Sequence, residues 1–420
     1  MNNFLALGTL PTRKSFIKLN LMLVFAALCI TIPALVQAQN YDLVIKGGRM
    51  IDPKNNIDAP MDIAVNEGII ARVASNIPGD SAERVVDANG LIVTPGLIDM
   101  HVHVNRYTPR GLDGYTFRAG VTTVVDGGTF GWRYFHMMQE YLDNSQTRVL
   151  AFIDIVGSKG TPHINSMTLV LDPSDRDPAV TASMINRNSD VIVGIKTWKA
   201  PSFEGIEQAV EAGDMADVPV MIDFGSSDPL MSLERLLLDV FRPGDIYTHA
   251  YAYHPNTREA IVDENYRVEP HVLAARERGI IFDVGHGGGA FSFEGAIPAV
   301  EQGFLPDVIS TDLHWNSMNG GAKDMANMMS KFLAMGMSLQ PVIEASTWTP
   351  AQVIQREELG HLSEGAEADI AVFSLREGDF GFLDVRNKLL KGTRKLEAEL
   401  TLRAGEVVWD LNGLAGDPVE

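Results

Sequence analysis

The sequence predicts an α/β protein, a (β/α)8 TIM-like barrel with a small composite β-sandwich formed by the two ends of the chain. The middle of the chain, residues 95–345, alternates eight short apolar segments with amphipathic helical patterns, which is typical of βαβ units and a parallel sheet. Eight such units in about 250 residues match a (β/α)8 barrel. The flanks, 41–94 and 350–415, carry short alternating strands and turn signals.

The two flanks predict one sandwich because their patterns match. In the first flank, Asn66-Glu67-Gly68 is typical of a hairpin turn between two strands. In the second flank we expect strands over 368–373 and 397–409, with a turn at Gly405. The barrel is then inserted between the two halves of the sandwich.

Eight buried strands are predicted in the middle of the chain, each followed in most cases by a helix. The strands are residues 97–103, 122–126, 148–157, 191–196, 219–223, 245–249, 279–286 and 307–312. The clearest helices are residues 203–216, 230–241, 268–278, 295–303 and 322–335. From His103 to Asp312 there are 209 residues (312 minus 103) over seven steps, or about 30 per step, which suits one strand, one helix and two loops.

Residues 1–38 have the plan of a secretory signal peptide. Arg13, Lys14 and Lys18 form a basic region, and a mostly apolar run follows over residues 19–36. Small residues precede the bond after Ala38, so we expect cleavage there and a secreted or periplasmic protein. An uncleaved membrane anchor is the alternative, since the run approaches the roughly 20 residues that span a bilayer.

Composition and charge exclude several classes of protein. The 420 residues are 45% hydrophobic and 21% charged, an ordinary globular profile that excludes disordered and collagen-like chains. The net charge is −20, and −23 (31 minus 54) without residues 1–38, so no nucleic-acid partner is expected. The one cysteine, Cys29, lies in the predicted signal, so the mature chain forms no disulfide. We expect a small-molecule substrate and no stable membrane association after cleavage, and we leave a homo-oligomer open.

Polar and ionisable residues stand at the C-terminal ends of the predicted strands, the face on which barrel enzymes build their sites. They are His101, His103, Asp126, Lys196, Asp223, His249, His286 and Asp312. His101-Val-His103 is the strongest local signal, because residues two apart in a strand point to the same side and both imidazoles can reach one metal ion.

These residues carry a resemblance to a known family. The stretch from Pro95 to His103, the strand-end Lys196, His249 and Asp312, and the run 360–369 together resemble the amidohydrolase superfamily of metal-dependent hydrolases over residues 41–410. The segments 194–196, 242–249 and 285–287 are similar to its amidohydrolase/deacetylase branch, which is associated with hydrolysis of acetylated small acids.

The resemblance implies a metal centre. His101, His103 and Asp312 would bind one divalent ion, and Lys196, as a carbamate, would bridge it to a second ion held by His249 and a residue of the fifth strand. We expect two zinc ions, with manganese or iron as alternatives. An ordinary ion-paired Lys196 is the alternative to a carbamate.

The fifth strand departs from the family pattern. Two-metal relatives usually carry His where this sequence has Asp223. An aspartate oxygen ligates zinc at about 2.0–2.2 Å, so we expect Asp223 to be a ligand of the second ion. In the alternative, Asp223 only accepts hydrogen bonds from the ligands and the centre is mononuclear.

The predicted reaction is hydrolysis of an amide or ester bond by hydroxide attack, with removal of acetate from a small acetylated amino or hydroxy acid. Asp312 is the expected proton acceptor and donor. His286 is expected to contact the substrate or its oxyanion, and a histidine that only supports its loop is the alternative. A cyclic-amide hydrolase of the dihydroorotase or hydantoinase kind, and an inactive barrel that serves as a binding protein, are the other functions considered.

Overall fold

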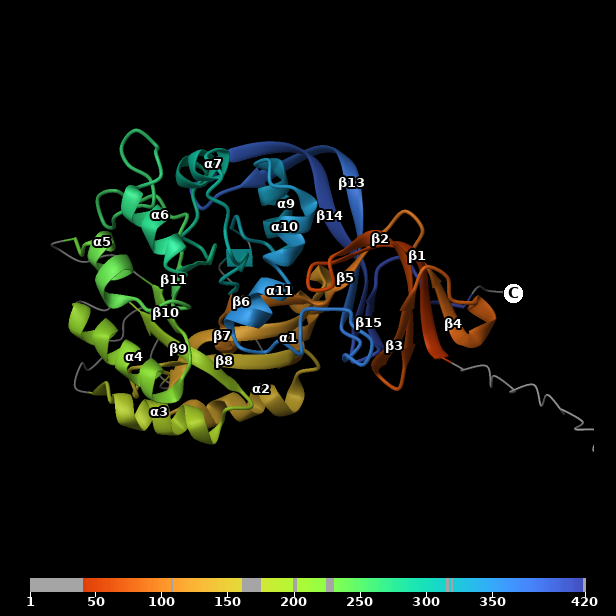
Figure 1. Cartoon of the computed structure of the whole chain (residues 1–420), viewed down its shortest axis with the longest axis horizontal. Coiled ribbons are helices and arrows are strands. Elements are labelled where there is room, and N and C mark those ends of the chain that lie inside the picture. The colour runs from red at the N-terminus through yellow and green to blue at the C-terminus, as the bar shows by residue number, and fades with distance from the viewer. Residues whose placement is uncertain are drawn as a thin grey trace, which may run out of the picture. The chain divides into compact units, whose positions relative to one another are not determined.

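The computed structural model describes residues 41–106, 109–160, 175–198, 202–223, 230–314, 317–318 and 320–417. By contacts the chain divides into residues 1–39 and residues 40–420, and the second unit contains both sheets described below (Figure 1). The predicted signal peptide and its cleavage after Ala38 lie outside the described residues. In the described ranges, no helix combines the length and apolar character needed to cross a bilayer.

A seven-stranded parallel sheet forms the barrel wall, in the order β12-β11-β10-β9-β8-β7-β6. Its strands are β6 (Leu97–Val102), β7 (Val121–Gly131), β8 (Arg148–Asp154), β9 (Ile192–Trp198), β10 (Val220–Asp223), β11 (Ile246–Thr248) and β12 (Ile281–Phe282). These strands confirm seven of the eight predicted ones.

The eighth predicted strand, residues 307–312, is not a regular strand. It makes isolated parallel bridges, from Val308 to Asp283 beyond β12 and from Leu313 to Val102 of β6. The backbone of Asp312 has φ 45°, and an extended ladder cannot pass through a left-handed residue. The segment nevertheless takes the eighth place, because its two bridges join the first and last strands of the sheet.

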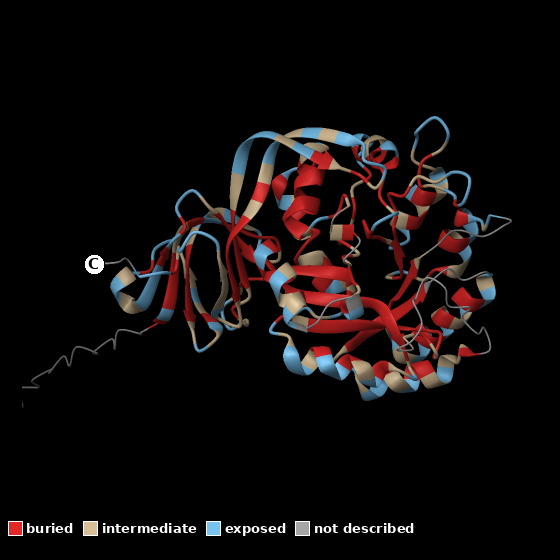
Figure 2. Ribbon diagram, turned by 180° about the vertical axis from the view of Figure 1, so that it is seen from behind, coloured by how far each residue is buried: buried red, intermediate tan, exposed pale blue. Residues whose placement is uncertain are grey.

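Helices cover the outside of the barrel, and Figure 2 shows their outer faces exposed around buried strands. They are α1 (Pro109–Thr116), α2 (Gln139–Asn144), α3 (Pro178–Arg187), α4 (Phe203–Ala216), α5 (Leu233–Arg235), α6 (Pro270–Glu277), α7 (Phe293–Glu301), α9 (Met325–Ala334), α10 (Leu339–Glu344) and α11 (Trp348–Val353). The predicted helix 230–241 is instead the single turn α5 continued by a π-helical turn, Leu236–Val240. Short 3-10 turns lie at Gly79–Ser81, Val104–Arg106, Phe117–Ala119 and Phe135–Met138.

The two flanks pair with each other, as the sequence predicts. Their strands are joined in one mixed sheet of eight strands. The order is β15-β14-β13-β5-β1-β2-β3, with β4 also on β1, and β13 joins β5 antiparallel through the pair Ile370 and Pro95. The strands are β1 (Tyr41–Asp52), β2 (Ile57–Asn66), β3 (Ile69–Ala74), β4 (Ala82–Asp87), β5 (Ile92–Pro95), β13 (Ile370–Leu383), β14 (Leu389–Arg403) and β15 (Glu406–Asp410). Both predicted turns are confirmed, with positive φ at Glu67 and Gly68 and at Ala404 and Gly405.

The hairpin of β13 and β14 is much longer than the sequence predicts. Its outer half leaves the composite sheet and passes over α9 toward α7 (Figure 1). The amide of Leu396 donates to the hydroxyl of Ser330 on α9 (2.9 Å), and the amide of Val385 donates to the carbonyl of Phe291 (3.2 Å). The composite domain therefore reaches the loops that follow the seventh and eighth barrel segments.

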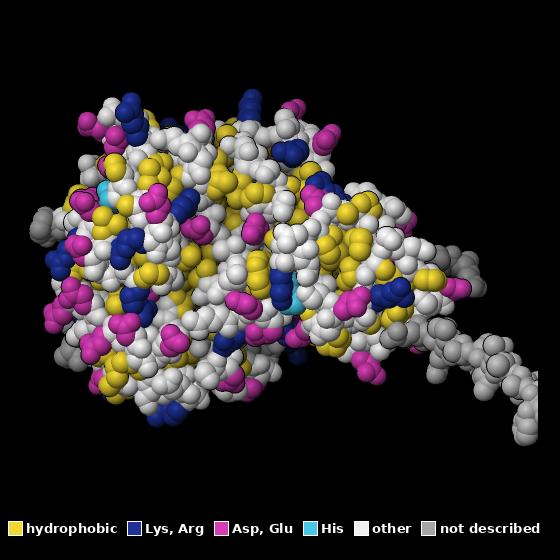
Figure 3. All heavy atoms as spheres, viewed as in Figure 1, with side chains coloured by type: hydrophobic (Ala, Val, Ile, Leu, Met, Phe, Trp, Pro, Cys, Tyr) yellow, Lys and Arg dark blue, Asp and Glu magenta, His cyan; other side chains and the backbone are white. Residues whose placement is uncertain are grey.

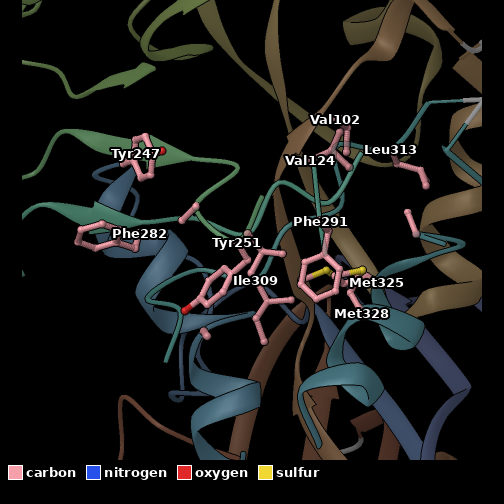
Figure 4. Packing of buried hydrophobic residues seen from close by; sticks show 14 of the residues in the cluster. Val102, Val124, Tyr247, Tyr251, Phe282, Phe291, Ile309, Leu313, Met325 and Met328 are labelled. Atoms are coloured by element: carbon pink, nitrogen blue, oxygen red, sulfur yellow. The ribbon is translucent and has the colours of Figure 1, made fainter. Parts of the chain in front are cut away.

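Two apolar clusters stabilise the barrel. The interior is filled from the strands, for example by Ile98, Phe152 and Ile246, and Ala351 of α11 joins this cluster. A larger cluster lies between the strands and the helices and includes the closely spaced Phe291, Met325 and Met328 (Figure 4). Both clusters fix the strand ends that carry the polar residues.

Candidate metal centre

Side chains from the ends of several strands meet at the C-terminal face of the barrel. His101 is the fifth residue of β6, Lys196 lies in β9, and His249 directly follows β11. His101, His249 and Asp312 each offer a ligand atom, and these atoms lie within 4.8 Å of one another. His103 joins them, with its Nε2 3.2 Å from Asp312 Oδ1.

Hydrogen bonds fix the tautomer of His101. Its Nδ1 is 3.0 Å from the Thr248 hydroxyl, and that hydroxyl donates its proton to Asp283 (2.6 Å). The hydroxyl oxygen must therefore accept a proton from Nδ1 of His101. The lone pair of His101 then lies on Nε2, which points to the centre of the cluster, 3.8 Å from Asp312 Oδ1.

His103 and His249 have the same arrangement. Nδ1 of His103 is 3.3 Å from the Thr129 hydroxyl, which itself donates to Asp126 (2.6 Å). Nδ1 of His249 bonds the carbonyl of Gly285, an acceptor only. All three histidines thus present an Nε2 lone pair, the form in which imidazole binds a metal.

Asp312 supplies the negative charge of this cluster. Its Oδ1 is buried and has no hydrogen-bond partner among the residues that the structure describes. Burial raises the pKa of Asp312, but His101 and His103, when protonated, lower it more, and the net shift is far below its usual range. A buried anionic oxygen beside three imidazole nitrogens is a donor set that fits a divalent metal ion.

The backbone holds two of these residues in an unusual conformation. His249 has φ 57° and Asp312 has φ 45°, both in the left-handed region that non-glycine residues rarely occupy. Such strain persists only where surrounding contacts impose it, and it is common at functional sites.

Lys196 lies beside the histidines, with Nζ 2.8 Å from Nε2 of His101. It is 2% exposed, and burial lowers its pKa, which favours the neutral amine that carbamate formation requires. Within the described part of the chain, the hydrogen-bond partners of Nζ are His101 and Met221, so the ion-paired alternative has no partner there. Gly128 makes room for Lys196, since a Cβ at Gly128 would lie 2.3 Å from the Lys196 Cβ.

Asp223 ends β10 and lies next to His249 rather than beside Asp312. Its Oδ2 is 3.7 Å from His249 Nε2, and 15% of its side chain is exposed. Burial would raise the pKa of Asp223, but His249 and Lys196 lower it. An ionised carboxylate therefore stands at the side of the cluster where the resemblance implies the second ion.

His286 does not have the open position expected for a substrate contact. Its ring is buried, with Nε2 2.8 Å from Nζ of Lys331 and Nδ1 2.8 Å from the carbonyl of Gly287. Because both nitrogens have protein partners, this placement favours the alternative in which His286 supports its loop. Sequence reasoning did not identify Lys331, although a lysine inside the apolar run of helix α9 was a signal.

Sequence reasoning also missed the residues that orient the ligands. Thr248 and Asp283 orient His101, and Thr129 and Asp126 orient His103. In the sequence, Asp126 stands out only as a polar residue at the end of a predicted strand. Threonines in strands have no local pattern that reveals such a role.

A barrel with this cluster at its strand ends defines a class of metal-binding hydrolases. The chain belongs to the amidohydrolase family, whose model matches residues 92–235 and 248–408. The family typically binds divalent metal, in agreement with the donor set.

Known relatives make the class more specific. The chain is 32% identical over 365 residues to a deacetylase of Brucella anthropi (84% of this chain, 88% of the relative) and 31% identical over 353 residues to a deacetylase of Agrobacterium fabrum (81% and 85%). Among solved structures it is similar to an adenine deaminase (27% identity, TM-score 0.78, 88% of this chain and 100% of that chain) and a dihydroorotase (28%, 0.75, 88% and 97%). The chain is therefore a hydrolase that acts on amide bonds.

Proposed function

We propose that the chain is an exported, metal-dependent deacetylase that releases acetate from a small acetylated amino or hydroxy acid. The observation that carries this proposal is the set of three Nε2 lone pairs near Oδ1 of Asp312, an oxygen without a hydrogen-bond partner in the described part of the chain. The similarity to deacetylases over more than four fifths of the chain supports the acetyl group as the part removed.

In this proposal His101, His103 and Asp312 hold one zinc ion, and His249 and Asp223 hold a second. Lys196, as a carbamate, would supply ligand oxygens to both ions. When bound, zinc lowers the pKa of water toward neutrality and polarises the acyl carbonyl. Asp312 accepts the proton of the attacking water and returns it to the leaving group.

A cyclic-amide hydrolase is the second candidate. A solved dihydroorotase is 28% identical and covers 88% of this chain, so the same barrel supports ring opening in a relative. Both reactions use a water attack on a carbonyl carbon, and the difference lies in the substrate.

The test combines metal content with a substrate panel. The protein, purified without chelator, should contain two ions per chain, and Asp223→Ala should lose one of them while Asp223→His keeps both. The intact mass of the peptide that contains Lys196, measured under conditions that preserve carbamates, should show the modification. One ion in the wild type would leave a mononuclear hydrolase in which Asp223 is not a ligand.

The substrate panel contains N-acetyl amino acids, O-acetyl hydroxy acids and cyclic imides. Release of acetate from the first two groups supports the proposal and separates amidase from esterase activity. Turnover of the cyclic imides alone would replace the deacetylase with the second candidate.

A further inference from the structure

Lys331 is a buried lysine that the metal centre itself does not use. It lies on α9, is 0% exposed, and donates to the carbonyl of Gly321 (2.6 Å). Its Nζ also lies 2.8 Å from Nε2 of His286. Across the described residues, the hydrogen-bond partners of this Nζ are the His286 ring and the Gly321 carbonyl, and no ion pair holds Lys331. A buried lysine without an ion pair is costly, which calls for a function other than packing.

The first contact of Lys331 fixes the ring of His286. Because Nδ1 of His286 bonds the carbonyl of Gly287, Nδ1 carries the proton and Nε2 accepts from Lys331. Burial and the nearby Lys331 hold the pKa of His286 well below its usual value, so the ring is neutral. The ring also stacks on Phe291, with centroids 4.7 Å apart and planes 18° apart.

The segment that His286 holds lies directly against Asp312. The amide of Gly287 donates to the carbonyl of Thr311 (2.9 Å), and a Cβ at Gly287 would lie 2.3 Å from Asp312 Oδ2. Gly287 has φ 53°, so only glycine fits this close approach. The position of the Gly287 backbone therefore limits where the carboxylate of Asp312 can lie.

The second contact of Lys331 holds the chain on the other side of Asp312. Gly321 follows Asp312 by nine residues, and the Ser317 hydroxyl between them bonds the Asp312 carbonyl (3.3 Å). A Cβ at Gly321 would lie 2.9 Å from the His286 ring and 2.5 Å from the Leu383 carbonyl. Lys331 thus contacts two segments near Asp312. One contains His286 and precedes Asp312 in the chain, and the other contains Gly321 and follows it.

We infer that Lys331 is a positioning residue for the hydrolytic reaction, which acts through His286 and Gly321 to hold the Asp312 carboxylate in its productive orientation. The strained backbone of Asp312 needs such outside contacts to persist. The expected effect of Lys331 on the rate rests on the proposed function, but its expected effect on the position of Asp312 does not.

The test compares Lys331→Met with Lys323→Met, an exposed lysine eight residues earlier on the same connection. For Lys331→Met we expect unchanged metal content, a kcat about 10- to 100-fold lower, and a KM within about threefold of the wild type, since a small misplacement reduces the rate without loss of binding. Cobalt-substituted Lys331→Met should also show a shifted visible d–d spectrum, because Asp312 is an expected ligand. Lys323→Met should match the wild type in all of these measurements.

A double-mutant cycle with His286→Phe tests the route of the effect. If Lys331 acts through His286, the double variant should lose no more kcat than the worse single variant, whereas independent losses that multiply would overturn the inference. A wild-type kcat and cobalt spectrum in Lys331→Met would also overturn it. If Lys331→Met does not fold, Lys331→Leu, which also removes the N–H donor, replaces it in the same measurements. If the wild type hydrolyses nothing on the panel, the proposed function fails and the cobalt spectrum still decides the inference about Lys331.

Discussion

At the scale of single residues, the site depends on which atom of each side chain is left free. Hydrogen bonds occupy Nδ1 of His101, His103 and His249, and Oδ1 of Asp312 has no partner within the described ranges. The residue types were visible in the sequence. Which atoms are left free was not visible, because the residues that occupy the other atoms, such as Thr248 on Nδ1 of His101, lie on strands distant in the sequence.

Asp312→Asn should lower kcat by about a thousandfold or more, because the amide neither carries the negative charge nor accepts the proton of the attacking water. The measurement is steady-state kinetics on the best substrate of the panel. Asp379→Asn, at an exposed position of β13, should leave kcat unchanged. A barrel that only binds would show no turnover for either variant to lose.

Thr248→Val should weaken metal affinity about 10- to 100-fold, because His101 loses the acceptor that fixes its tautomer. Competition with a chelator measures this affinity. Thr401→Val removes a comparable buried hydroxyl, which donates to Phe117 (2.8 Å) away from the cluster, and should not change it. Equal affinities for all three proteins would show that Thr248 does not orient His101.

At the scale of elements, agreement with the sequence follows the strength of the local pattern. The helix over 203–216 has an amphipathic pattern, and α4 has those bounds. The strand over 307–312 has an equally apolar pattern, but the left-handed Asp312 ends its ladder. The outer half of the β13 and β14 hairpin mixes charged residues and glycines with apolar ones, so it gives no clear strand pattern, and contacts with α9 hold it.

Asp62 of β2 stabilises an irregular part of the composite sheet. Its carboxylate accepts from Lys46 (2.6 Å), from the amide of Gly47 at the bulge of β1 (2.8 Å) and from the amide of Ile77 (2.8 Å). Burial would raise the pKa of Asp62, but these hydrogen bonds lower it. A carboxyl with a lowered pKa stabilises the fold above its unfolded pKa of about 3.9 and loses this effect as the pH falls through its folded value.

Asp62→Asn should therefore reduce the free energy of unfolding by about 1–3 kcal/mol at pH 7, and by progressively less below about pH 4. Urea unfolding at several pH values measures the difference. Asp58→Asn on the same strand removes an ion pair with Arg49 that is about half exposed on the arginine side, and should cost under about 1 kcal/mol. A difference for Asp62→Asn that does not change with pH would contradict the linkage.

At the scale of the whole molecule, the two ends of the chain complete one sheet although 275 residues separate Pro95 from Ile370 (370 minus 95). The net charge of the 420 residues is −20, and on the face in Figure 3 the Lys and Arg side chains are dispersed among Asp and Glu. That the chain has no nucleic-acid partner stays a prediction from its net charge.

We predict that the chain is exported from the cytoplasm. Full-length protein produced in a secreting bacterial host should be recovered outside the cytoplasm with Gln39 as its first residue. Intact mass and N-terminal sequencing measure the cleavage, and replacement of Ala38 by a bulky residue should block it. Recovery of the uncleaved chain in the membrane fraction would support the anchor alternative instead.

The sequence alone determined the alternation of strands and helices, the strands within each of the two flanks, and the types of residue at the strand ends. These properties depend on near neighbours along the chain, where periodicity and turn residues are visible. Only the tertiary structure decided that His286 is buried behind Lys331, that threonines orient the histidines, and that Oδ1 of Asp312 has no hydrogen-bond partner among the residues described. Burial, tautomers and free lone pairs depend on contacts between residues far apart in the chain, and no local pattern records those contacts.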